Sequence, residues 1–143
     1  MHEEFHSQEF TEKGGVFEMV QLWVNLPAKL KMTTPRYQRL LGSQFPRLSF
    51  GSARGRLVAG TLFGETGPAK THSPMTVFDL EFHDDGLTSF ELKPGTTTLL
   101  CVLAGDVELQ GSYAANPGEV VVLDRTTNGA VRLEGKTGAR LLV

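Results

Sequence analysis

The chain has few of the features that mark a secreted or membrane-bound protein. Its single cysteine, Cys101, excludes an internal disulfide and is typical of a reducing compartment. No apolar run approaches the ~20 residues that a helix needs to cross a bilayer. The N-terminus has no basic segment followed by an apolar one, as a secretory signal would have. We therefore expect a cytoplasmic protein with no membrane partner.

An excess of charge of either sign is also lacking. The formal net charge is −2, and charged residues make up 21% of the 143 residues. This balance argues against a basic face that binds nucleic acid directly, and against an acidic disordered tail. Apolar residues make up 40%, so the composition is that of a globular protein long enough to bury a core.

Sustained helical periodicity is absent as well. From Ser49 onward, short β-rich runs alternate with glycine turns at a spacing of about 8–15 residues, the pattern of a sandwich or barrel. Apolar and polar residues alternate at 76–82 and at 131–133, as in strands with one buried face. The sequence therefore predicts an all-β fold.

The first third of the chain has a different residue pattern, with one run of β-formers followed by a proline-containing segment. Residues 16–26, VFEMVQLWVNL, are dense in β-formers and predict a further strand. Residues 27–48 contain three prolines and predict an extended connector, with at most one short helical turn near residues 37–41.

The run QLWVNLPAKLKMTTPRYQ, residues 21–38, resembles the connector of the pirin family, and PAKTHSPMTVFD, residues 68–79, resembles the opening of a pirin second barrel. Pirins are bicupins, with two double-stranded β-helix (jelly-roll) barrels in one chain. The resemblance implies remnant strands from the end of a first cupin barrel at 1–26, a connector at 27–48 and a second cupin barrel at 49–143. It implies a pirin fragment that lacks most of the N-terminal barrel.

A candidate metal site lies at the start of the chain, in HEEFHS. His2 and Glu4 are two residues apart, so on a strand both side chains would face one ion. Imidazole with carboxylate suits Fe(II), Mn, Ni or Zn. The resemblance implies iron held by three histidines and one glutamate, with His2 and Glu4 as the later His-x-Glu pair. It also implies a catalytic role for Glu4, as metal ligand and acceptor of the substrate's proton.

The partner His-x-His pair of that site is not in the sequence, whose other histidines are His6, His72 and His83. His6 is either a rim residue or a substitute third ligand, because it lies two positions beyond Glu4. We therefore predict a metal half-site.

The second barrel offers poor ligands. Alignment with the cupin metal pattern places Glu91, Lys93 and Thr97 at ligand positions, with Val131 or Leu133 at the last one. An ammonium group has no lone pair to give to a metal, and the last position is apolar. We expect a metal-free second barrel, in which His72 is structural, His83 is an exposed turn residue and Cys101 is buried.

Three functional interpretations remain open. The resemblance implies an iron-dependent quercetin 2,3-dioxygenase, which opens a flavonol ring with dioxygen, although this chain by itself holds too few ligands to be active. It also implies a non-catalytic regulatory module of the transcriptional co-regulator type, which would bind a protein partner. The third interpretation is a remnant with no separate activity.

Self-association is a further expectation. Without a covering sheet, the large apolar side chains of residues 16–26 would be partly exposed, and each would forfeit ~1.5–3 kcal/mol of burial. We therefore predict a homo-oligomer whose interface uses the exposed N-terminal strands.

Overall fold

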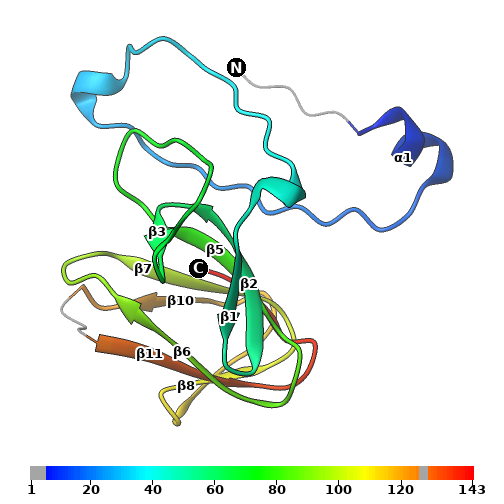
Figure 1. The fold of residues 1–143 in the computed structure, drawn as a ribbon, viewed down its shortest axis with the longest axis vertical. Coiled ribbons are helices and arrows are strands. Elements are labelled where there is room, and N and C mark those ends of the chain that lie inside the picture. Colours follow the sequence, from blue (N-terminus) through cyan, green and yellow to red (C-terminus); the bar gives the residue numbers. More distant parts are fainter. Residues whose placement is uncertain (1–5, 126–128) are drawn as a thin grey trace. The chain divides into compact units, whose positions relative to one another are not determined.

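The protein is described here by a computed structural model that covers residues 6–125 and 129–143. It divides into two units, Met1–Lys31 and Met32–Val143, of which the second contains the whole barrel (Figure 1). No helix in the described ranges is long and apolar enough to cross a membrane.

The barrel consists of two antiparallel sheets, which confirms the predicted all-β fold. In order across the first sheet, the strands are β1 (Arg47–Phe50), β2 (Ala53–Ala59), β5 (Val77–Phe82), β12 (Arg140–Leu142), β7 (Thr98–Ala104) and β10 (Val120–Leu123). In the second sheet they are β6 (Gly86–Leu92), β11 (Gly129–Gly135), β8 (Val107–Leu109) and β9 (Tyr113–Ala115). A small hairpin, β3 (Thr61–Leu62) and β4 (Glu65–Thr66), follows β2.

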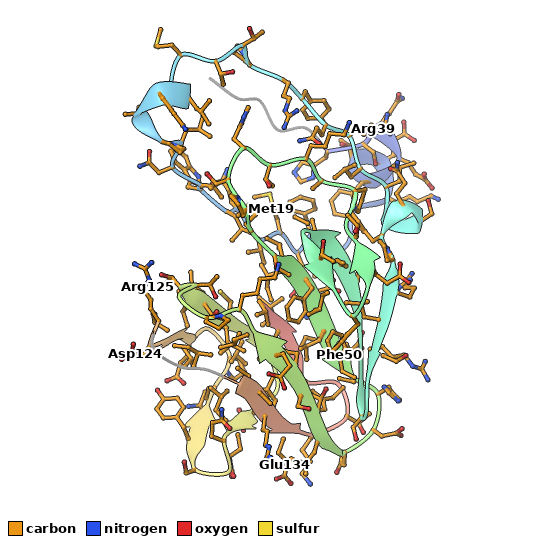
Figure 2. All side chains as sticks on the ribbon, turned by 60° about the vertical axis from the view of Figure 1, so that its left-hand side comes forward. Met19, Arg39, Phe50, Asp124, Arg125 and Glu134 are labelled. Carbon is orange, nitrogen blue, oxygen red and sulfur yellow. The ribbon has the colours of Figure 1, made fainter. Side chains whose placement is uncertain are left out.

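The core forms where the inward residues of both sheets meet. Alternation along β5 buries Phe78, Leu80 and Phe82, as the sequence predicted, and β11 buries Val131 and Leu133 while Arg132 between them is exposed. Fully buried side chains of this size contribute about 1.5–3 kcal/mol each. Glu134 on β11 points away from the barrel (Figure 2).

An aromatic cluster fills part of this core. The rings of Phe78 and Phe90 meet edge to face at 5.1 Å between centroids, and Phe50 stacks on Phe78 at 5.6 Å. Phe63, in the β3–β4 turn, contacts Phe50 at 5.2 Å even though its φ is +50°, a value that bulky residues rarely adopt. The ring contact joins the β3–β4 hairpin to the aromatic cluster. Figure 2 shows Phe50 among the strands of the barrel.

A strap formed by residues 32–41 is fastened to the loop before β5. The Gln38 side chain donates to the Lys70 carbonyl at 2.8 Å and accepts from the Lys70 N–H at 2.8 Å. Arg36 donates to the same carbonyl at 2.9 Å. The two segments that carry the pirin resemblance, PRYQ and PAKTHSP, are therefore hydrogen-bonded to each other.

The N-terminal unit departs from the prediction. Residues 16–26 were predicted to form a strand, yet no strand occurs between residues 6 and 46. Its regular elements are α1 (Gln8–Lys13) and a 3₁₀ turn at Ala28–Leu30. The predicted strand is missing because a strand takes its hydrogen bonds from a neighbouring strand, and the described part of this unit, residues 6–31, contains no such neighbour.

The connector prediction also needs a correction. Residues 27–48 contain two 3₁₀ turns, at Ala28–Leu30 and at Gly42–Gln44, and neither lies at residues 37–41. Arg36 and Gln38 reach across to Lys70 from an extended backbone, whereas at the later turn the Gln44 side chain accepts the Leu41 N–H at 2.6 Å.

Candidate functional site

The predicted metal pair, His2 and Glu4, lies outside the described residues, so the structure does not place either side chain. His6 is the only one of the three predicted ligands that is described. The site at the start of the chain therefore remains a prediction from the sequence.

His6 belongs to a small ring cluster in the N-terminal unit. Its imidazole stacks on Phe10 at 5.3 Å between centroids, with an interplanar angle of 14°, and meets Phe17 edge-on at 4.6 Å. Helix α1 positions Phe10, because the Ser7 hydroxyl accepts the Phe10 N–H at 3.1 Å and begins the helix. His6 is thus held by aromatic neighbours.

The barrel residues at the cupin ligand positions do not lie around a common centre. Glu91, Lys93 and Thr97 are exposed, and Glu91 lies on the outer face of β6, whereas Val131 and Leu133 are fully buried in the core. Across the described residues, no group of three or more His, Cys, Asp or Glu side chains could hold a metal ion. The described part of the chain does not fit a metal centre.

The two histidines of the barrel differ in environment. His72 is exposed, in the loop before β5. His83 was predicted to be an exposed turn residue, but its side chain is only 29% exposed. Its Nε2 lies 3.3 Å from Asp84 Oδ2, and its buried Nδ1 has no protein hydrogen-bond partner in the described structure. The turn folds this imidazole back against the barrel.

Cys101, predicted to be buried, is half-buried on the outer face of β7. Its register partners are Val120 on β10 and Leu142 on β12. Leu99, two residues earlier, is also exposed on this face and pairs with Val122. This side of the six-stranded sheet therefore carries an apolar strip, made of Leu99, Cys101, Val120 and Val122.

The other half of the same face is charged. Arg56 on β2 donates through Nε and Nη2 to Asp79 on β5, and the Arg56 N–H donates to the same carboxylate at 2.8 Å. The side-chain hydrogen bond to Asp79 raises the pKa of Arg56, so the guanidinium stays charged at any physiological pH. We interpret the pair as a structural link between β2 and β5.

Several partly buried apolar side chains lie at the margin of the core. Leu62, Leu92, Val121, Leu123 and Val143 are partly buried and pack against the core. Arg125 bridges the neighbouring loop by donating twice to the Gly95 carbonyl, at 3.1 and 3.2 Å. Asp124 and Arg125 lie together at the end of β10 (Figure 2).

The comparisons with known proteins agree with one another. The whole chain is 39% identical, over 145 aligned residues, to a Pseudomonas aeruginosa protein provisionally named quercetin 2,3-dioxygenase, of which it covers 50%. It is 26% identical over 144 residues to Pirin-1 of Arabidopsis thaliana, with 92% of this chain and 48% of that protein aligned. No family model matches the chain.

A solved structure gives the same result. The crystal structure of a quercetin 2,3-dioxygenase from Acinetobacter baumannii matches with a TM-score of 0.90 and 34% identity, over 96% of this chain and 48% of that one. Two antiparallel sheets closed over one apolar core, matched in this way, define a cupin barrel. Within the cupins, the chain belongs to the pirin family, which confirms the resemblance seen in the sequence. The chain spans about half the length of the curated relatives that it matches.

Proposed function

We propose that this chain takes part in metal-dependent oxidation of the quercetin 2,3-dioxygenase type. The observation that carries the proposal is 39% identity, over the full chain, to a protein provisionally given that name. In this proposal His2 and Glu4 are the chain's share of the metal ligands and iron is the metal. The remaining ligands come from another segment or another polypeptide.

The described residues do not supply the missing metal ligands. They contain no cluster of side chains fit for a metal, and the printed sequence has no His-x-His pair to complete the site. We therefore expect the 143-residue chain by itself to have no dioxygenase activity towards a flavonol. Its metal affinity is the property to measure.

The first prediction concerns that affinity. Titration of the purified chain with Fe(II) under anaerobic conditions, or with Mn(II), is expected to show weak binding. His2→Ala and Glu4→Ala should each lower the affinity at least tenfold, because each removes a ligand from an already incomplete set. His72→Ala, at an exposed histidine of the barrel, is the matched control and should leave the affinity unchanged. Equal affinities for the wild type and His2→Ala would contradict the proposal.

A second candidate function is a regulatory module that acts by binding other proteins. The observation that favours it is the filled barrel interior, which the Phe50–Phe78–Phe90 cluster occupies, beside an outer face with an apolar strip. On this alternative, loss of metal ligands would change nothing, and partner binding would map to the barrel surface.

We also propose that the chain forms a homo-oligomer through its N-terminal apolar run, residues 16–26. Phe17, Met19, Leu22, Trp23 and Val24 are not buried within their own unit, and apolar side chains of this size favour an interface. The single cysteine supports a cytoplasmic location.

A further inference from the structure

The two edge strands of the six-stranded sheet differ in their protection against a further strand. On β1 the exposed residues are Arg47 and Ser49, and a charged side chain on an edge discourages pairing with another chain. On β10, residues 120–123 read VVVL, without a charge, a proline or a glycine. No strand of the described residues pairs with the side of β10 that lies away from β7. The sheet is therefore blunted at one edge only.

The free side of β10 presents backbone hydrogen-bonding groups. The Val102 N–H of β7 donates to the Glu119 carbonyl at 3.0 Å, so the backbone groups of residue 119 point towards β7. Successive residues of an antiparallel strand alternate in the direction of these groups. Val120 and Val122 therefore turn their N–H and C=O groups to the free side, where they form a template for another strand.

The side chains of β10 limit which residues of a second β10 can lie opposite them. Val120 and Val122 are 54% and 64% exposed on the outer face, whereas Val121 and Leu123 pack against the core. In an antiparallel pair, residues directly opposite each other have their side chains on the same face. Two registers with a two-fold axis satisfy this condition and overlap most of the strand, one centred on Val122 and one centred on Val121.

Charge complementarity selects the register centred on Val122. This register sets Val121 opposite Leu123 on the core side, and it sets Glu119 opposite Arg125 at both ends of the pair. Opposite charges in directly opposite positions stabilise a strand pair. The register centred on Val121 sets Glu119 opposite Leu123 and brings no opposite charges together. Only the first register is therefore complementary in both apolar and charged residues.

The two charged residues also have contacts within their own copy. Glu119 accepts the Asn116 N–H at 2.8 Å and the Asn116 side-chain amide at 3.3 Å, both through Oε2. Arg125 donates to a loop carbonyl through Nε and Nη2. These contacts leave Glu119 Oε1 and Arg125 Nη1 for a contact across copies. The remaining opposite pair, Val120 with Asp124, places no like charges together.

We propose that the free edge of β10 is an interface with a second copy of this chain, in which the two β10 strands pair antiparallel about a two-fold axis at Val122. The pairing joins two six-stranded sheets into one, and it closes after two copies because both use the same patch. This interface is separate from the proposed association through residues 16–26 and from the metal pair His2 and Glu4.

The second prediction tests the register on the full chain by disulfide cross-linking. In a Cys101→Ser background, Val122→Cys places two thiols directly opposite each other, at a Cα separation of about 5.5 Å that a disulfide can bridge. Mild oxidation should convert most of this variant into a covalent dimer. Val120→Cys, at the other exposed valine, is the matched control. Its two copies lie four residues apart along the strands, about 13 Å, and should not cross-link.

A charge-swap experiment tests the pairing of Glu119 with Arg125 without a cysteine. Glu119→Arg sets arginines opposite each other at both ends, and Arg125→Glu sets glutamates opposite each other. Each variant alone should lose the dimer in sedimentation velocity at micromolar concentration, because like charges placed directly opposite are destabilising. An equimolar mixture should restore the dimer, since both ends then pair an arginine with a glutamate. Circular dichroism and thermal unfolding establish that each variant retains a folded barrel.

The outcomes separate this interface from the other proposals. Leu22→Lys disables the run 16–26 and should leave the Val122→Cys cross-link unchanged, whereas loss of the cross-link would overturn the β10 assignment. A cross-link that forms only between Val120→Cys and Val122→Cys copies would overturn the register. A chain that stays monomeric and uncross-linked would overturn the interface itself. The metal titration with His2→Ala is independent of all these results.

Discussion

The exposed side chain of Asp85 links two turns of the barrel through three hydrogen bonds. Its carboxylate accepts from the Thr137 N–H at 2.8 Å, the Thr137 hydroxyl at 3.1 Å and Lys136 Nζ at 3.1 Å, and so links the β5–β6 turn to the β11–β12 turn. Hydrogen bonds to a carboxylate favour its charged form. The pKa of Asp85 is lowered, first by the Thr137 N–H and then by Lys136.

The third prediction follows from the sign of that shift. Because the folded-state pKa lies below the unfolded value of about 3.9, Asp85 stabilises the fold above that value. This contribution is lost as the pH falls through the folded-state pKa. Asp85→Asn should therefore lower the Tm at pH 7, and the difference from wild type should shrink as the pH is taken below about 4. Calorimetry over this pH range measures both.

The control for this prediction is Asp106→Asn, at an exposed aspartate just before β8. It should change the Tm little at any pH. If the gap between the wild type and Asp85→Asn stayed constant into acid, the carboxylate contacts would not be the source of the stability.

At the scale of elements, the strap at residues 32–41 shows how an irregular segment is fixed. Gln38 both donates to and accepts from the Lys70 backbone, so one amide side chain replaces the ladder contacts of a strand pair. Tyr37 between the two anchoring residues is 88% exposed. Hydrogen bonds from polar side chains, and not packing of Tyr37, therefore fasten this part of the strap.

The fourth prediction concerns this fastening. Gln38→Ala removes both hydrogen bonds to Lys70 and should lower the free energy of unfolding by up to about 1 kcal/mol, since exposed hydrogen bonds lie at the low end of their range. Urea unfolding measures the change. Tyr37→Ala should be close to neutral. A larger loss for Tyr37→Ala than for Gln38→Ala would show that packing, and not hydrogen bonding, holds the strap.

The elements also show what the sequence could and could not reveal. Alternation at 76–82 and 131–133 predicted β5 and part of β11 because burial on one face forces a period of two. β1 was hidden at the end of the proline-rich connector, and the three residues of β9 are too few to set a pattern. The strand predicted at residues 16–26 is absent because high β-propensity alone does not form a strand without a neighbouring strand to pair with.

The sequence around helix α1 contains signals from which this helix could have been predicted. Ser7 caps the helix, and within its six residues Gln8 donates to Glu12 at 2.9 Å and Lys13 pairs with Glu9 at 2.8 Å. These are the N-cap and i,i+4 contacts expected of a short surface helix. For the candidate site, the spacing of His2 and Glu4 could be read, whereas the half-buried position of His83 depends on turn packing that no local pattern encodes.

At the scale of the whole molecule, the two units differ in how their backbones are held. Residues 47–125 and 129–142 contain all the described strands, most of them in two sheets, whereas residues 14–27 have neither helix nor strand. Proteases cut where few backbone hydrogen bonds must be opened. We therefore expect proteases to cut the chain first near the boundary between the units, at Lys31 and Met32.

The fifth prediction is a limited proteolysis result. Trypsin at low ratio should cut after Lys29 and Lys31 before it cuts at Arg36, which is fastened to Lys70, and should leave a fragment that begins at Leu30 or at Met32. Mass spectrometry identifies the fragments, and thermal unfolding should show that the remaining barrel melts as the whole chain does. Early cuts within the barrel strands would contradict this division.

The position of β12 has a consequence for how the barrel is made on the ribosome. This strand lies between β5 and β7 in the six-stranded sheet and contributes the fully buried Leu141 to the core. Until residues 140–142 have been translated and have left the exit tunnel, β5 and β7 have no shared neighbour and the sheet has a gap at its centre. The barrel therefore closes only after its last strand has emerged, and the nascent chain up to that point presents two open strand edges that could pair with another chain.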